Sequence, residues 1–436
     1  MNLLARLAQR RPAAIVPRRT LGLLTLAHAF NHAQAALLPF VFLAIIDQFG
    51  VSVADVAFLS AVATLIAGGA QLAYGWLTRR FTRRAILGWG NVVLGAFMGL
   101  TALASSFVPF AAALIVSKLG GSPQHPVGNS LLAEQYPPHR RGFAISAHIA
   151  GGNLGTLGVP LVAAWLIAGV GWGPTLVLFG LPALLVGLAI LAFVGESGAG
   201  RAAAIAQGSV RSAIGTVLRD RDQMLIVASS VVASGARGLG VLNLFVPLYL
   251  ARVLGLDTTK VAVMLTALLV GSVPAPMVAG WLSDRLGRKP VVVSVYAGGA
   301  AALAIFILAG DDLALVWLGV LLLSVFSFVE SPQLQSLLAD ITRPGIRDAS
   351  FAVYFTLVFM AAAAWVATYG AMVDLLGEAA GLSLAFGTMA ASSVVAGLIV
   401  VPVRAAQRTA EVRREEALAA ETDTARVPGE PGLDVD

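Results

Sequence analysis

The feature that most constrains this chain is a series of long apolar segments that recurs between residues 20 and 403. A helix needs about 20 apolar residues to cross the hydrocarbon core of a bilayer. Only helices and closed β-barrels satisfy their backbone hydrogen bonds in lipid, and these segments are too long for barrel strands. Division of the chain at charged residues and at Pro and Gly predicts about twelve membrane-spanning helices. Their expected ranges are 20–46, 54–78, 84–104, 107–132, 142–168, 173–194, 222–251, 258–283, 289–309, 313–340, 346–375 and 379–403.

The composition agrees with a lipid-exposed protein. Of the 436 residues, 58% are hydrophobic and 12% are charged, whereas about 25% of the residues of a soluble domain are charged. So little charge cannot cover a water-facing surface, and the lipid bilayer is an expected partner. The net charge of +6 does not indicate nucleic-acid binding, because the basic residues lie at the ends of the apolar segments. The absence of cysteine excludes disulfides, thiol catalysis and thiolate metal ligands.

The placement of Lys and Arg predicts the orientation of the chain in the membrane. Nearly all of these residues lie at a chain end or in or beside an even-numbered link; the exceptions are Lys118, Arg237, Arg252 and Lys260. By the positive-inside rule, the basic links and both termini face the cytoplasm. The first apolar segment is too long for a signal peptide and is expected to be retained. We therefore expect a multi-pass protein of the inner or plasma membrane with both termini cytoplasmic.

Two sequence patterns occur twice, about half a chain apart. Residues 280–289 read Gly-Trp-Leu-Ser-Asp-Arg-Leu-Gly-Arg-Lys, and residues 75–84 read Gly-Trp-Leu-Thr-Arg-Arg-Phe-Thr-Arg-Arg. Ser-Pro-Gln, followed by Ser-Leu-Leu-Ala and an acidic residue, occurs in residues 122–134 and again in residues 331–340. An internal repeat of this kind predicts two halves of like structure.

The repeat predicts an all-α integral membrane fold with twelve transmembrane helices in two pseudo-symmetric six-helix bundles. Parallel halves related by an axis along the membrane normal form a transporter architecture, with the substrate path between them near the midplane. We expect a monomer. The expected parts are a basic cytoplasmic arm (1–19), a first bundle (20–194), a cytoplasmic linker (195–221), a second bundle (222–403) and a cytoplasmic tail (404–436) with a short helix and a disordered end.

Polar side chains within apolar segments are costly and therefore mark candidate sites. His28, Asn31 and His32 lie at positions i, i+3 and i+4 on one helix face. Glu330 and His32 are candidates for proton coupling, because a carboxyl group and an imidazole can each take up and release a proton. The candidate substrate-binding residues are His28, Asn31, His32, Lys118, Gln124, His125, Asn153, Arg237, Glu330 and Gln333.

Each of these candidates also has a structural interpretation. Arg237 or Lys118 could form an ion pair with Glu330 instead of binding an anion. His125 precedes Pro126 and could bond backbone carbonyls that the helix break frees. His28 and His32 have a metal-like spacing, but zinc usually takes a third protein ligand. No third ligand is evident, so no metal and no cofactor is expected.

Charged residues at the two basic turns form a candidate gate. Glu134 and Asp340 end their segments beside the turns, and each is expected to pair with arginines of the turn in its own half, Arg79 or Arg80 for Glu134 and Arg285 or Arg288 for Asp340. The candidate gating residues are Arg79, Arg80, Glu134, Asp284, Arg285, Arg288 and Asp340.

The pattern Gly-x-Leu-Ser-Asp-Arg-x-Gly-Arg-Lys between apolar helices resembles the inter-helix signature of the major facilitator superfamily. Residues 120–126 (Gly-Gly-Ser-Pro-Gln-His-Pro), residues 151–155 (Gly-Gly-Asn-Leu-Gly) and His28-x-x-Asn31 resemble its fosmidomycin resistance branch. This resemblance implies a proton-driven exporter of small drug-like or phosphonate-like compounds. The chain departs from the branch at His32 and Val127, where that branch typically has acidic residues.

These patterns predict a secondary transporter that works by alternating access. An enzyme is not expected, because the links contain no nucleophile–base set, metal motif or phosphate loop. The first hypothesis is proton-coupled efflux of small drug-like or anionic compounds, with Lys118 and Arg237 binding an anionic group. The second is an uptake symporter for an organic or inorganic anion. The third is a transport-inactive membrane scaffold or receptor, which the altered basic turn of the first half suggests.

Overall fold

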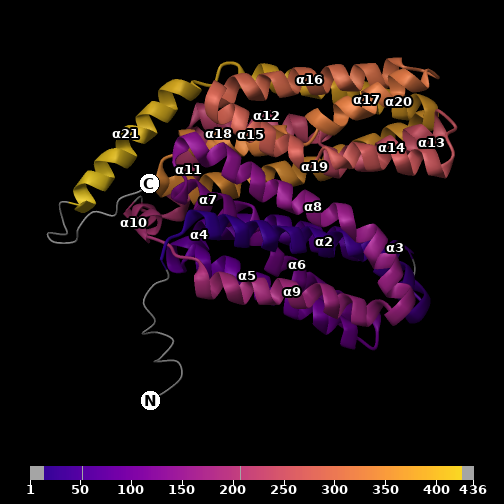
Figure 1. Cartoon of the computed structure of the whole chain (residues 1–436), viewed down its shortest axis with the longest axis horizontal. Coiled ribbons are helices and arrows are strands. Elements are labelled where there is room, and N and C mark those ends of the chain that lie inside the picture. Colours follow the sequence, from indigo (N-terminus) through magenta and orange to yellow (C-terminus); the bar gives the residue numbers. More distant parts are fainter. Residues whose placement is uncertain (1–13, 52, 207, 425–436) are drawn as a thin grey trace.

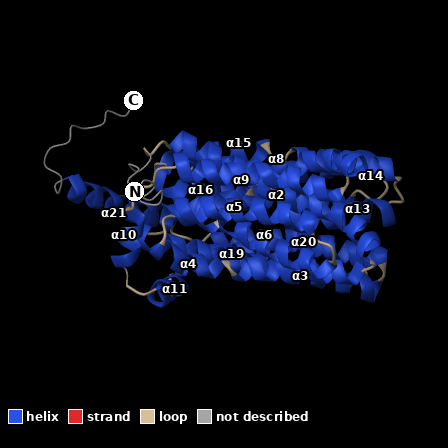
Figure 2. Cartoon of the chain, turned by 90° about the horizontal axis from the view of Figure 1, so that it is seen from below, coloured by secondary structure: helices blue, strands red, loops and turns tan. Residues whose placement is uncertain are grey.

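The structure, a computed structural model, describes residues 14–51, 53–206 and 208–424. The described residues are helical almost throughout and contain no strand (Figure 2). The N-terminal half and the C-terminal half form two bundles that lie side by side (Figure 1). Most of the predicted basic arm and the end of the predicted tail, residues 425–436, lie outside the described residues.

The first bundle contains six membrane-length segments, and three of them are broken. The breaks in the fourth segment coincide with Pro123 and Pro126, because proline lacks the N–H that would continue the helix. The elements are α2 (Pro17–Phe49), α3 (Val53–Gly69) with α4 (Gln71–Arg80), α5 (Arg83–Leu100) with η1 (Thr101–Leu103), α6 (Phe107–Gly121) with η2 (Ser122–Gln124) and α7 (Pro126–Gln135), α8 (Pro138–Val170), and α9 (Trp172–Phe193).

The second bundle repeats this plan in part. The second and fourth segments are broken in both bundles, whereas the first segment is broken only in the second bundle, at Arg237. Its elements are α12 (Arg221–Ala233) with η3 (Ser234–Ala236), η4 (Gly238–Leu242) and α13 (Asn243–Arg252), α14 (Thr258–Val270) with α15 (Pro274–Leu286), α16 (Arg288–Leu308), α17 (Leu313–Phe326) with α18 (Glu330–Ile341), η5 (Pro344–Ile346) with α19 (Arg347–Leu376), and α20 (Glu378–Val400). The twelve predicted ranges therefore each coincide with one segment, and the fold class is confirmed. Within the described residues, eight helical spans are long and apolar enough to cross a membrane, and some of them, such as Leu313–Ile341, join two of these helices.

Three further helices lie outside the bundles. The linker contains α10 (Ala199–Ala206) and α11 (Val210–Arg219), and the tail forms α21 (Ala405–Thr424). In Figure 1, α10 and α21 lie at one end of the molecule, which we call the basic end because the two basic turns also lie there. Bulky apolar side chains cover the outer faces of the bundles, as for Trp165, which is 74% exposed, and Leu308, which is 82% exposed. Such faces require lipid rather than water as their neighbour.

Glycine permits the closest helix contacts. A Cβ at Gly155 of α8 would overlap the backbone carbonyl of Ala29 in α2, so these two helices pack at backbone distance within the first bundle. Gly280, the first glycine of the second basic turn, lets α15 approach α8 across the boundary between bundles. A Cβ there would lie 2.6 Å from Ser146 Oγ and 2.7 Å from the carbonyl oxygen of Gly142. The turn motif therefore serves contact between the halves.

Candidate functional site

A polar cavity lies inside the first bundle. It has a volume of about 170 Å³, and its wall comes from α2, α3, α4, α5 and α6, with Phe359 of α19 closing one side. Of the predicted binding residues, Asn31, Lys118 and His125 line it. Sequence reasoning missed five other polar residues of the wall, although the rule for polar groups in apolar segments applies to them too: Gln34, Thr64, Gln71, Ser117 and Ser122.

Lys118 supplies the positive charge of this cavity. Among the described residues, no carboxylate lies within ion-pair distance of its ammonium group. Asn31 donates a hydrogen bond from Nδ2 to the Gly121 carbonyl oxygen at 3.0 Å. The side-chain oxygens of Gln34 and Gln71 are buried without a hydrogen-bond partner among the described residues. The cavity therefore offers one free cation and unused amide groups to a small polar molecule.

Arg237 and Glu330 form an ion pair in the second bundle. Arg237 lies in the break between η3 and η4, and its Nε donates to Glu330 Oε1 at 2.7 Å. Its Nη2 also donates to Ser230 Oγ at 2.9 Å. Glu330 is 5% exposed, and its Oε2 has no partner among the described residues. Of the two cations that the sequence left as alternative partners of Glu330, the structure selects Arg237.

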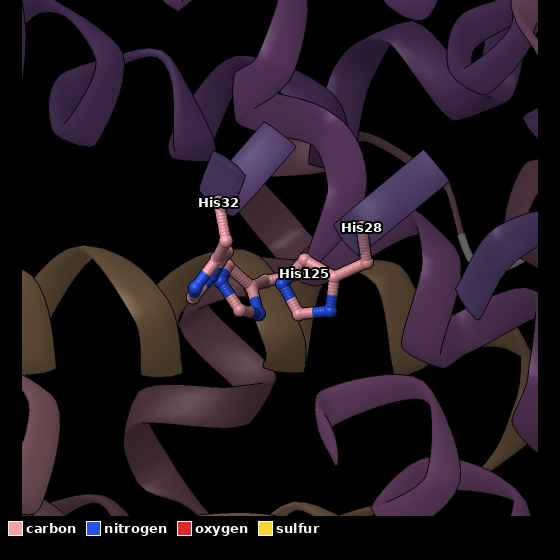
Figure 3. A group of neighbouring side chains, drawn as sticks. All are labelled: His28, His32 and His125. Atoms are coloured by element: carbon pink, nitrogen blue, oxygen red, sulfur yellow. The ribbon is translucent and has the colours of Figure 1, made fainter. Parts of the chain in front are cut away.

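Four histidines gather beside the cavity. His28 and His32 come from α2, His125 from the break between η2 and α7, and His148 from α8. The ring of His28 lies 4.6 Å from the rings of His32 and His125, and 4.5 Å from that of His148, between ring centroids. Figure 3 shows the rings of His28, His32 and His125 grouped together. His28 and His32 thus have a third histidine, His125, beside them. The sequence alone did not identify this third residue.

The remaining candidate binding residues lie elsewhere. Gln124 is buried, and the nitrogen and oxygen of its side-chain amide have no partner among the described residues. Asn153 of α8 donates to the Ser272 carbonyl oxygen at 2.6 Å, and Gln333 of α18 donates to Ser146 Oγ at 3.1 Å. Both of these bonds join the two bundles, so Asn153 and Gln333 belong to the boundary between bundles and not to the cavity wall.

The basic end is closed by buried ion pairs between the bundles. Arg83 of α5 donates to both carboxylate oxygens of Asp348 in α19, at 2.9 and 2.8 Å. Arg141 of α8 donates to Asp340 Oδ1 at 2.9 Å, and Arg288 donates to Asp340 Oδ2 at 2.9 Å. We call these five residues the basic-end network.

Asp284 and Arg288 add contacts to the start of α8. Asp284 accepts hydrogen bonds from the backbone N–H groups of Gly142 and Phe143 at 3.1 and 3.0 Å, and it pairs with Arg288. Arg288 donates to the Pro138 carbonyl oxygen at 2.7 Å. The second basic turn is therefore bound to the first bundle through its Asp and its last Arg.

The predicted partners of Glu134 were wrong. Glu134 pairs with Arg83 at 2.7 Å, because Arg83 begins α5 and points into the bundle. Arg80 instead stacks over Trp76 at 4.4 Å, and Arg285 stacks in the same way over Trp281 at 3.7 Å. Arg79 donates to the Gly208 carbonyl oxygen of the linker.

The repeat itself could have identified Arg83. In the two basic turns, Arg83 occupies the position of Arg288, and the pair Arg83–Glu134 corresponds to the pair Arg288–Asp340. Nothing comparable indicated Arg141 and Asp348, which lie outside both motifs. Arg79 stands where the second turn has Asp284, so the two halves are bound asymmetrically.

Two like bundles, with a polar cavity in the first and buried ion pairs between them at one end, define a class of protein, the multi-pass membrane transporters built from two six-helix repeats. The family model described as Major Facilitator Superfamily matches residues 24–367 and 237–428. The chain belongs to the Major Facilitator Superfamily.

Several known proteins are similar to this chain. A protein of Haemophilus influenzae described as a metabolite transport protein is 23% identical over 241 residues, which cover 53% of this chain and 59% of that relative. The cis,cis-muconate transport protein of Acinetobacter baylyi is 25% identical, over 65% of this chain and 69% of its own. The fosmidomycin resistance protein of Escherichia coli is 26% identical, over 69% and 73%. Among solved structures, the proton:xylose symporter XylE covers 88% of this chain and 94% of its own, with 17% identity and a TM-score of 0.70.

Proposed function

We propose that this protein is a proton-coupled exporter of small organic anions that works by alternating access. The observation that carries the proposal is the ammonium group of Lys118, which faces a polar cavity without an acidic partner among the described residues. A buried cation is costly unless an opposite charge approaches it. A carboxylate or phosphonate of a substrate would supply that charge, and the unused amide oxygens beside it would accept from hydroxyl or amino groups.

The relatives support small organic anions as the substrate class, and both export and uptake remain to be tested. Muconate, which the Acinetobacter relative transports by its name, is a dicarboxylate. The fosmidomycin resistance relative supports export. Uptake of an organic anion by symport is the second candidate, and the unpaired cation of the cavity favours it equally.

Alternating access would use the basic-end network as its inner gate. We propose that the basic end faces the cytoplasm, because the Lys and Arg residues concentrate there. With the network formed, the cavity would be closed to the cytoplasm. Separation of the network would then open the cavity on that side, as the bundles rock against each other.

Glu330 is the proposed proton carrier. Its Oε2 is buried without a partner, and its Oε1 is held by Arg237. Protonation of the carboxylate would weaken the pair with Arg237, and this change links proton binding to the packing of the second bundle. His32, in the histidine cluster, is the second candidate.

The test is transport in proteoliposomes that are loaded with muconate, 4-hydroxybenzoate or fosmidomycin. We expect exchange of at least one of these anions, with loss of exchange in Lys118→Ala and partial recovery in Lys118→Arg. Lys260→Ala is the matched control, because Lys260 is exposed and pairs with Asp257 far from the cavity. Equal exchange by the wild type and Lys118→Ala would refute the cavity assignment.

The direction of transport and its coupling to protons are measured with an imposed pH gradient of either sign. Accumulation of the anion against its own gradient only when protons move the opposite way would support export by antiport. Accumulation together with protons would support the symport alternative. A Glu330→Gln variant that keeps full coupling would remove Glu330 from the mechanism, and the absence of any exchange would favour the transport-inactive scaffold.

A further inference from the structure

We infer that His28, His32 and His125 form a binding site for a divalent first-row transition metal ion, with one coordination position open to the cavity beside Lys118. One ring nitrogen from each residue lies within 4.8 Å of the other two. Tetrahedral zinc with Zn–N bonds of about 2.1 Å places its ligand atoms about 3.4 Å apart. The three side chains would therefore have to move closer together to bind the ion.

The hydrogen bonds of the rings leave the correct nitrogens free. His28 Nδ1 lies 2.8 Å from the His148 carbonyl oxygen, and a carbonyl oxygen only accepts, so this nitrogen carries the proton. The lone pair of His28 is therefore on Nε2, which is fully buried and has no partner among the described residues. A histidine that binds a metal typically donates its other N–H to a backbone carbonyl in this way.

Of the other two histidines, His32 has one ring nitrogen beside an oxygen, and His125 has one buried ring nitrogen without a partner among the described residues. His32 Nδ1 lies 3.3 Å from Thr156 Oγ1, which leaves His32 Nε2 for a metal. His125 Nδ1 is buried without a partner among the described residues. Buried polar atoms without partners are uncommon and call for an explanation. Three ring nitrogens of the histidine cluster are buried in this way, His28 Nε2, His125 Nδ1 and His148 Nδ1, and an ion bound by His28 and His125 explains the first two.

Packing alone does not explain this arrangement. Gly152 of α8 leaves just enough room for the His28 ring, since a Cβ there would lie 3.0 Å from ring carbon Cε1. Edge-to-face contact would need only aromatic rings, and Phe would supply it without polar atoms. Two elements, α2 and the break before α7, instead bring three imidazoles to one point.

The charges around the site define what occupies the open position. The three ligands are neutral imidazoles, and the neighbouring charges are the cations Lys118 and Arg237. A metal bound here would keep its full positive charge and would require an anion as its fourth ligand. His125 lines the cavity, so this anion would be chloride, hydroxide or a carboxylate that enters from the cavity. The site stands on geometry alone and does not depend on the proposed transport activity.

The test uses full-length protein with an affinity tag that contains no histidine, purified in detergent and stripped with a chelator. Titration with Co²⁺ should give the visible absorption of a tetrahedral complex at one ion per chain. Zn²⁺ measured by calorimetry should compete for the same site. Loss of a metal ligand should weaken Zn²⁺ binding at least about 100-fold, because even the loss of a supporting hydrogen bond costs 10–100-fold.

The variants are His32→Gln and His125→Gln, with His139→Gln as the matched control. His139 is the fifth histidine and lies at the exposed start of α8, outside the cluster. Thermal unfolding and size-exclusion chromatography establish that each variant is folded. Undiminished Zn²⁺ binding by both cluster variants, or no stoichiometric Co²⁺ spectrum from folded wild type, would overturn the inference. A cobalt absorption band that shifts on addition of chloride or acetate would establish the open position.

Discussion

The substitution Asp348→Asn should open the basic end. Asp348 accepts two hydrogen bonds from Arg83 across the boundary between bundles, and both side chains are nearly fully buried. Asn keeps the shape of the side chain but removes the charge. Arg83 retains Glu134 at 2.7 Å, so the first bundle itself loses little. The change therefore acts on the contact between bundles.

The magnitude follows from the lost charge. A hydrogen bond to a charged group contributes about 2 kcal/mol net to the closed state. That free energy changes the equilibrium between closed and open basic ends about 30-fold. A closed population of 99% would fall to roughly 75%.

Spin-label distance measurements can detect this shift, since the chain has no cysteine to remove. Labels at Phe81→Cys and Leu286→Cys, both exposed and on opposite bundles, report the separation at the basic end. We expect a new population at longer distance in Asp348→Asn. Glu378→Gln is the control, because it removes an exposed pair with Arg252 at the opposite end, and such pairs contribute about 0–1 kcal/mol. An unchanged distance distribution in a folded Asp348→Asn protein would refute the role of the network.

Three further predictions concern stability and the tail. Arg237→Ala should destabilise the second bundle by about 3 kcal/mol, because it leaves Glu330 buried without its cation. Thermal unfolding measures this loss of stability. Replacement of both Arg237 and Glu330 by apolar residues should restore much of the lost stability. Gly155→Ala should lower the unfolding temperature through overpacking of about 1–3 kcal/mol, whereas Gly169→Ala in the same helix has open space and should not. Glu416→Gln should loosen the tail helix at the basic end by about 1 kcal/mol, while Arg343–Glu415 and Arg408–Asp220 still hold it. Faster proteolysis of the tail would report the change, and equal cleavage of variant and wild type would contradict the contact.

The sequence by itself determined the membrane-spanning segments and their repeat. Each predicted range coincides with one helical segment, because lipid leaves the backbone of an apolar segment no alternative to a helix. The two copies of the basic turn also predicted two like bundles, because similar sequences in similar surroundings fold alike. The polar positions of α2 also had to share one face, because helical spacing places His28, Asn31 and His32 together.

Only the tertiary structure decided which polar groups meet. Lys118 and Arg237 both lie inside membrane-spanning segments, and the choice of Arg237 as the partner of Glu330 depends on how α18 packs against the break between η3 and η4. His125 joins His28 and His32 because a helix break turns its ring toward α2, and no spacing along the chain encodes that direction. Contacts between segments far apart in sequence depend on the relative position of whole helices. That position is determined by the packing of all the segments against one another.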